Sequence, residues 1–88
     1  MIVNRGALVG HDVEIEDFVT LGPGSNVAGF CRIGSAAYIA AGAVVIDRIT
    51  VGAGSIVAAG AVVVKDVAPR SQVMGVPARV VKEDVEPR

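Results

Sequence analysis

The sequence predicts an all-β fold, a parallel β-helix of hexapeptide repeats that ends in a short C-terminal tail. An aliphatic residue returns every six positions, and a second small or apolar set follows each of these residues by four positions. An amphipathic helix would show a recurrence near 3.6 residues and a half-buried strand a recurrence of 2. A six-residue period is typical of a parallel β-helix.

The two sets define which residues should face the interior. The aliphatic set is Val3, Val9, Ile15, Leu21, Val27, Ile33, Ile39, Val45, Val51, Val57 and Val63. The second set is Ala7, Val13, Val19, Ser25, Cys31, Ala37, Ala43, Ile49, Ser55, Ala61 and Val67. A triangular coil takes three hexapeptides, so residues about 18 apart should stack on strands about 4.8 Å apart. Residues 3–68 would then build between three and four coils.

Between the strands the chain must bend, and the residues there suit bends. These are Gly10, Gly22, Pro23, Gly24, Asn26, Gly29, Gly34, Gly42, Gly52, Gly54 and Gly60. Glycine permits a positive φ and proline presets φ, so we expect them at the corners of the coil.

The period ends near Pro69, because proline cannot donate to a strand ladder. We therefore expect a parallel β-helix domain over 1–68 and a C-terminal tail over 69–88. Within the tail, Val80 to Glu86 fits a short strand or one helical turn equally well.

Two alanine-rich pieces allow another interpretation, because alanine favours helices. Helices over Ser35 to Val45 and Val57 to Val64 would carry Gly42 and Gly60 in their interiors, together with many β-branched residues. The strand interpretation is therefore preferred.

Composition points to assembly. The chain has 88 residues, of which 52% are hydrophobic and only three are aromatic. A domain of this size buries only about 60–65% of its unfolded surface, and apolar residues such as Phe18, Phe30 and Ile46 fall in outward phases. We expect a homotrimer with parallel coil axes. The first coil begins without a cap, so either another subunit or a ligand should cover that end, or a larger ancestral protein has lost its N-terminal domain.

Charge and cysteine content exclude several classes. A formal charge of −1 suggests neither nucleic acid nor an anionic membrane as partner. The longest uncharged run, Ile49 to Val64, is too short and too rich in glycine for a membrane span. The single Cys31 cannot form an internal disulfide, and no secretory signal opens the chain, so a cytoplasmic, reducing setting is expected.

Several motifs stand in this frame. They are Gly10 to Val19 with its His11-Asp12 pair, Leu21-Gly22-Pro23-Gly24, Val27-Ala28-Gly29, Ile33-Gly34 and the closing Gly75-Val76-Pro77-Ala78-Arg79. Together they resemble the hexapeptide-repeat acyltransferases, most of all the C-terminal domain of the sialic acid and bacillosamine acetyltransferase branch. The resemblance implies a left-handed coil, against the usual right-handed crossover. It also implies a homotrimer and transfer of acetyl from acetyl-CoA to a nucleotide-linked sugar amine or hydroxyl, at clefts between subunits.

Acetyl transfer needs a base and donors for the developing oxyanion. His11 is the only histidine and exchanges protons near neutral pH. The resemblance makes His11 the catalytic base, Asp12 its orienting partner and the Gly29 N–H the donor to the thioester oxygen. Without the resemblance, we would interpret His11 as a surface histidine, Asp12 as a solvated carboxylate and Gly29 as a corner glycine.

The resemblance also suggests binding residues. Ala41 and Ala59 would line the pantetheine channel of CoA, and Arg79 and Lys82, with Lys65 nearby, would meet its phosphates. Thr20 stands where members of this branch often carry a second histidine, so its hydroxyl is a candidate contact for the substrate. The basic residues could equally serve solubility.

The sequence bears on three alternatives to a histidine-dependent acetyltransferase. Cys31 falls in an inward phase, so it should pack as a small apolar group instead of acting as a nucleophile. The γ-class carbonic anhydrases share the expected fold but need three histidine ligands for zinc, and one histidine excludes that site. A catalytically silent trimeric β-helix, left after loss of an N-terminal sugar-nucleotide-binding domain, remains the alternative to the enzyme. Titration with acetyl-CoA would separate the two.

Overall fold

The computed structural model describes residues 2–85 and consists of short strands, most of them two residues long. They are β1 (Ile2–Val3), β2 (Leu8–Val9), β3 (Glu14–Ile15), β4 (Thr20–Leu21), β5 (Asn26–Val27), β6 (Arg32–Ile33), β7 (Tyr38–Ile39), β8 (Val44–Val45), β9 (Thr50–Val51), β10 (Ile56–Val57), β11 (Val62–Val63), β12 (Gln72–Met74) and β13 (Arg79–Lys82). No helix in the described part of the chain could cross a membrane.

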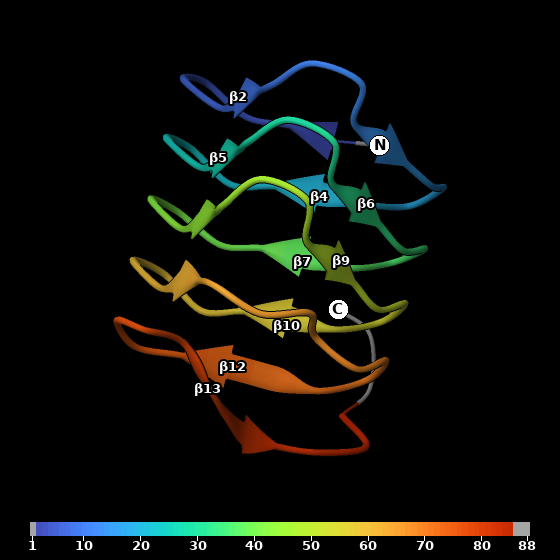
Figure 1. Cartoon of the computed structure of the whole chain (residues 1–88), viewed down its shortest axis with the longest axis vertical. Coiled ribbons are helices and arrows are strands. Elements are labelled where there is room, and N and C mark those ends of the chain that lie inside the picture. The colour runs from blue at the N-terminus through green and yellow to red at the C-terminus, as the bar shows by residue number, and fades with distance from the viewer. Residues whose placement is uncertain (1, 86–88) are drawn as a thin grey trace.

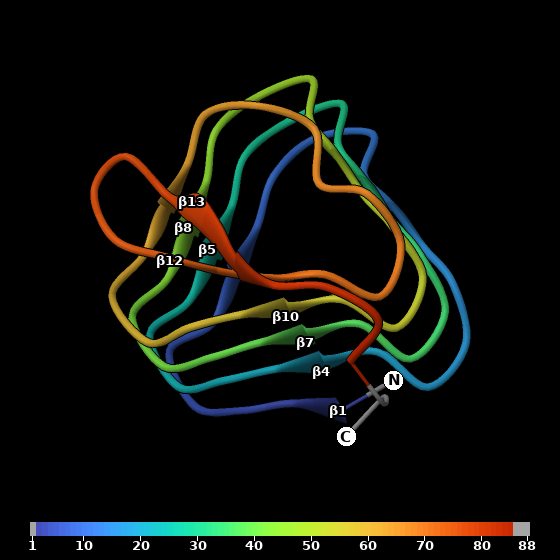
Figure 2. The ribbon, with the colours of Figure 1, turned by 90° about the horizontal axis from the view of Figure 1, so that it is seen from below.

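The strands wind into a coil with three faces (Figures 1 and 2). Face A contains β1, β4, β7, β10 and β12, face B contains β2, β5, β8 and β11, and face C contains β3, β6 and β9. Neighbouring strands within these faces are parallel, and the register pairs Ile2 with Thr20 and Leu8 with Asn26, a step of 18 residues. The predicted left-handed parallel β-helix is confirmed. The helices considered over residues 35–45 and 57–64 are wrong, because β7, β8, β10 and β11 lie there.

The interior contains the two residue sets that the period predicts. From Val19 onward both sets are buried, and Leu21, Ile33 and Ile39 have no exposed surface. The first coil differs, because Val3 and Val9 are 46% and 43% exposed. Within residues 2–85, their counterparts one coil later have a coil on each side, whereas Val3 and Val9 have one on a single side.

The outward sides of the three faces differ in polarity. Face C is polar, since Arg32 Nε lies 3.1 Å from Glu14 Oε2 and the Thr50 N–H donates to Asp66. Faces A and B carry rows of mainly apolar side chains, which include Ile2, Tyr38 and Ile56 on face A and Leu8, Val44 and Val62 on face B. An outward Ile46 was expected, but it is half-buried and packs against the core.

Corner glycines play two roles, and the sequence suggested only one. Gly24, Gly42, Gly54 and Gly60 have positive φ, as expected for bends. Gly10, Gly22, Gly34 and Gly52 are instead sites of close approach between coils. A Cβ on Gly22, for example, would lie 2.7 Å from the Ala41 nitrogen, a distance that real Cβ atoms do not adopt. These glycines let consecutive coils pack at strand spacing.

The regular period breaks just after β11, a few residues before Pro69. Val63 still pairs with Val45, a step of 18, but Val67 pairs with Val51, a step of 16. The corner at residues 64–66 is therefore two residues shorter than the equivalent corners of the earlier coils. Pairing continues at the shorter step, because β12 lies parallel to β10 with Val73 opposite Val57. The expected boundary between 68 and 69 thus falls inside a continuous stack of strands.

The C-terminal end is closed by a hairpin. β13 runs antiparallel to β12 and crosses the end of the coil (Figure 2). Of the two interpretations offered for Val80 to Glu86, the strand is correct for residues 80–82, and Glu86 lies outside the described residues.

Candidate functional site

The predicted base lies on one edge of the prism, here called the His11 corner (residues 11–12, 29–30 and 47–48). The Phe30 N–H donates to the His11 carbonyl oxygen at 2.8 Å, and the Arg48 N–H donates to the Gly29 carbonyl oxygen at 3.0 Å. Main-chain hydrogen bonds thus stack the three levels directly. The expected stacking of Gly29 on His11 is confirmed.

His11 and Asp12 are close together and open to solvent. His11 Nδ1 lies 3.7 Å from Asp12 Oδ2, and the side chains are 93% and 68% exposed. At this separation the contact is electrostatic and too long for a good hydrogen bond. Asp12 has a φ of 54°, a conformation that asparagine and aspartate tolerate better than other residues. The pair is therefore placed for acid–base work but needs a substrate or another chain to exclude water.

Gly29 keeps the space beside His11 open. A Cβ at this position would lie 3.3 Å from the His11 carbonyl oxygen and 3.9 Å from the His11 Cβ. Any larger residue would press against the histidine. Glycine thus allows a ligand to approach the backbone next to the imidazole.

Ala41 and Ala59 stack as predicted, but on a different edge, the Ala41 corner (residues 5–6, 23–24, 41–42 and 59–60). The Gly60 N–H donates to the Ala41 carbonyl oxygen at 3.0 Å. Both alanines are exposed, and the following residue at every level is a glycine with positive φ. This edge therefore offers accessible backbone with small side chains. Face B separates it from the His11 corner, so one chain does not bring His11 together with Ala41 and Ala59.

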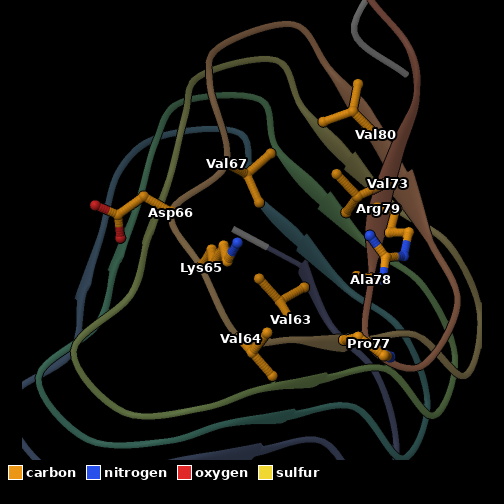
Figure 3. A pocket seen from close by; sticks show the side chains of 10 residues that line it. All are labelled: Val63, Val64, Lys65, Asp66, Val67, Val73, Pro77, Ala78, Arg79 and Val80. Carbon is orange, nitrogen blue, oxygen red and sulfur yellow. The ribbon is translucent and has the colours of Figure 1, made fainter.

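A pocket of about 300 Å³ opens at the C-terminal end, where the coil cuts its corner short (Figure 3). Its residues are Val63, Val64, Lys65, Asp66, Val67, Val73, Pro77, Ala78, Arg79 and Val80. Lys65 and Arg79 are thus brought together as expected. Lys82 is not among the lining residues and pairs with Gln72 further along β13. The pocket could not be foreseen, because it depends on the shortened corner and on where β13 crosses.

Thr20 lies apart from the histidine within one chain. It is half-buried on the outward side of face A, between Ile2 and Tyr38 of the neighbouring strands. The His11 corner lies where faces B and C meet, on the opposite side of the coil from face A (Figure 2). A contact from Thr20 to a substrate at His11 therefore requires another chain.

Two residues that sequence reasoning did not assign to a site join the His11 corner. The Arg48 Cζ atom lies 4.9 Å from the centre of the Phe30 ring, a cation–π contact. Both follow Asp12 in steps of 18, so the period could have placed them beside the histidine.

Cys31 is buried and its Sγ lies 3.0 Å from the Ile46 carbonyl oxygen, as its inward phase predicted. Among residues 2–85, no group of three or more histidine, cysteine, aspartate or glutamate side chains is placed to hold a metal ion.

The coil and its histidine corner define the chain as a hexapeptide-repeat β-helix, and solved structures of this class are similar to it. Perosamine N-acetyltransferase from Caulobacter crescentus, a point mutant in complex with CoA and GDP-perosamine, is 38% identical with a TM-score of 0.89. The acetyltransferase domain of PglB from Neisseria gonorrhoeae, in complex with acetyl coenzyme A, is 31% identical with a TM-score of 0.83. A galactoside acetyltransferase in complex with coenzyme A shares the fold at 22% identity and a TM-score of 0.78. No family model matches the chain, and neither does any curated protein.

These likenesses, with the repeat and the fold, show that the chain is similar to the hexapeptide-repeat acetyltransferases and is consistent with that family. The matches cover 93%, 90% and 90% of this chain but only 41%, 47% and 56% of the three similar chains, in the order given. The chain thus spans about half the length of the proteins it resembles.

Proposed function

We propose that the chain is an acetyl-CoA-dependent acetyltransferase that acts on an amine or hydroxyl of a sugar, nucleotide-linked in its natural form. The observation that carries this proposal is the His11 corner, where the single histidine lies beside Asp12 and directly under Gly29. Perosamine N-acetyltransferase and the PglB acetyltransferase domain, which are 38% and 31% identical to this chain, form complexes with CoA and acetyl coenzyme A, respectively.

The corner suits direct transfer in a ternary complex. The acceptor nitrogen or oxygen attacks the thioester carbon while His11 takes its proton. The Gly29 N–H donates to the oxygen that becomes negatively charged in the tetrahedral intermediate. The C–S bond then breaks, and His11 returns the proton to the departing CoA thiolate. Asp12 orients the imidazole and favours its transient positive charge.

The site is completed by a second copy of the chain. Within one chain, face B separates the His11 corner from the Ala41 corner, so the two parts of the proposed site do not meet. In a homotrimer with parallel axes, the His11 corner of one subunit can face the Ala41 corner of the next. The mainly apolar outward sides of faces A and B supply the surface for this contact, whereas the ion-paired face C remains in solvent. A stable monomer in sedimentation at micromolar concentration would contradict the assembly.

CoA then extends along the axis of the coil. The thioester lies at the level of His11 and Gly29, and the pantetheine arm passes the accessible backbone at Ala41 and Ala59. The phosphates reach the C-terminal pocket, where the positive charges of Lys65 and Arg79 outnumber the one negative charge of Asp66 and the valines offer an apolar wall. Lys82 lies outside the pocket and can add only longer-range attraction. Thr20 from a neighbouring subunit can hydrogen-bond the substrate.

Two measurements test the function. Calorimetric titration with acetyl-CoA should show one binding site per subunit, and release of CoA thiol should follow addition of an amino sugar or its nucleotide conjugate. Binding without transfer to any acceptor in a panel of amino sugars would contradict the proposed activity. Absence of acetyl-CoA binding would favour the catalytically silent scaffold, because a scaffold has no use for a CoA site.

A further inference from the structure

A stacked aromatic and cation lie on the edge that carries the proposed base. Phe30 follows Gly29 directly and stacks one level above Asp12, and Arg48 stacks one level above Phe30. The Arg48 guanidinium lies over the Phe30 ring, with Cζ 4.9 Å from the ring centre. The ring thus separates Arg48 from Asp12 and leaves Asp12 as the neighbour of His11.

Both residues adopt a backbone conformation that large side chains avoid. Their φ angles are 61° for Phe30 and 60° for Arg48. The matching positions of the Ala41 corner are all glycine, namely Gly6, Gly24, Gly42 and Gly60, with φ between 68° and 75°. Phe18 and Arg70 on the third edge adopt the same conformation, with φ of 64° and 57°, so this angle alone does not mark a binding site. The particular feature of the His11 corner is that the Arg48 guanidinium lies over the Phe30 ring.

The pair has the chemistry of a binding platform. Phe30 remains 55% exposed, so part of its apolar surface is free to contact the C–H face of a sugar. Arginine held flat on a ring keeps the edge of its guanidinium open, and that edge recognises phosphate or carboxylate through paired hydrogen bonds. Arg48 Nε lies 3.9 Å from Asp47 Oδ2, and both side chains are mostly exposed. This contact is weak enough for a ligand to replace.

The spacing along the edge fits one acceptor. Arg48 stands two levels from His11, about 10 Å at the usual strand spacing, and its long side chain can shorten that gap. A hexose with its reacting amine at His11 can lay its ring along Phe30 and point its anomeric substituent toward Arg48. A neutral glycoside would leave the guanidinium without a partner.

We propose that Phe30 and Arg48 select the acceptor, binding the sugar ring on Phe30 and an anionic group at its anomeric position on Arg48. The proposal rests on the acetyltransferase function above and assigns recognition of the sugar ring to Phe30 and of the phosphate at its anomeric position to Arg48. Of the similar enzymes, it places the chain with the one solved with GDP-perosamine and apart from the galactoside enzyme.

The test measures acetyl transfer from acetyl-CoA to three acceptors: a nucleoside-diphosphate amino sugar, an amino sugar 1-phosphate and a neutral methyl glycoside of the same sugar. Arg48→Gln should raise KM about tenfold for both anionic acceptors, with kcat and the neutral acceptor little changed. Arg48→Lys should recover part of the loss, because it keeps the charge but not the planar stack. The matched control is Arg32→Gln, which removes an exposed cation from face C and should change none of these values.

The experiment distinguishes an anion of the acceptor from an anion of CoA. It also distinguishes failure of this proposal from failure of the proposed function. If Arg48→Gln weakens acetyl-CoA binding in calorimetry and spares the acceptors, the anion belongs to CoA and the proposal is wrong. Equal losses for charged and neutral acceptors would also overturn it. If the wild-type protein transfers to no acceptor, the proposed function fails separately. Calorimetry with the nucleotide sugar in the presence of CoA then tests the role of Arg48 separately. If wild-type and Arg48→Gln proteins bind the nucleotide sugar with equal affinity, the proposed role of Arg48 is wrong too.

Discussion

Two edges of the same coil share one repeat but carry different side chains at their corner positions. On the His11 corner the left-handed positions hold Asp12, Phe30 and Arg48, whereas on the Ala41 corner glycine holds all of them. Both edges use the same main-chain hydrogen bonds between levels. The backbone is therefore the same at both edges. Only the side chains at the corner positions differ, which is how one fold supports different chemistries.

The third edge serves as an internal control. This Phe18 corner (residues 17–18, 35–36, 53–54 and 69–70) stacks by the same hydrogen bonds. It carries neither a histidine nor a run of glycines, and Phe18 on it is 79% exposed. Substitutions at the Phe18 corner therefore measure how a corner substitution affects the coil itself, apart from any effect on the proposed site.

The largest expected effect comes from His11→Ala. Removing the base should lower kcat/KM for acetyl transfer by a factor of about 10² to 10⁴, the usual worth of a positioned general base. Steady-state assays with a saturating acceptor measure it. Acetyl-CoA affinity and the oligomeric state should hardly change, because the side chain is exposed and contributes little packing.

The matched control for His11→Ala is Asp17→Ala, at the first corner position of the Phe18 corner in the same coil. It should leave kcat/KM within a factor of about 2, because surface substitutions away from a site have small effects. If the two variants lose activity equally, the His11 corner has no special role and the base lies elsewhere.

A smaller effect should follow from filling the Ala41 corner. Ala59→Phe places a ring on the exposed backbone where pantetheine should pass, so the Kd of acetyl-CoA should rise about tenfold, or 1.4 kcal/mol. Calorimetry measures this, and sedimentation checks that assembly survives. Ala53→Phe, an exposed alanine at the same phase on the Phe18 corner, should leave the Kd unchanged. A shared loss in both would mean that bulk anywhere on the coil is harmful.

The smallest effect is expected from Asp12→Asn. The carboxylate lies 3.7 Å from the imidazole and is mostly exposed, so solvent weakens its field. We expect kcat to fall less than tenfold, well below the loss from His11→Ala, with the KM for acetyl-CoA unchanged. Parallel kcat measurements on both variants decide it. A loss as large as that of His11→Ala would show that Asp12 does more than orient the histidine.

Periodicity predicted the coil and its interior well, because each hexapeptide repeats the same local geometry. Every member of the two inward sets from Val19 to Val67 is buried, and the stacks of Gly29 on His11 and Ala59 on Ala41 follow from the same step of 18. Such placements need only counting, once the period is recognised. The exposure of Val3 and Val9 was harder to foresee, because it depends on whether anything packs against the free side of the first coil.

What the sequence could not predict depends on departures from the period. The chain omits two residues after Val63, and no residue type at 64–66 announces it. That omission opens the C-terminal pocket and takes Lys65 out of line with His11. The glycines at 10, 22, 34 and 52 also look like those at 24, 42, 54 and 60, although one group relieves contact between coils and the other accommodates positive φ. Only the distances between neighbouring coils in the structure distinguish the two groups of glycines, and counting along the sequence does not give these distances.

The most direct test of the central claim, a site shared between two different edges of neighbouring chains, is complementation between inactive variants. His11→Ala lacks the base, and a double variant, Ala41→Phe with Ala59→Phe, lacks the CoA channel. Unfolded and refolded together in equal amounts, they should regain about one quarter of wild-type activity, because that share of interfaces in a cyclic trimer joins two intact edges. If the mixture is no more active than the two variants refolded apart, each chain carries its own complete site and the account is contradicted.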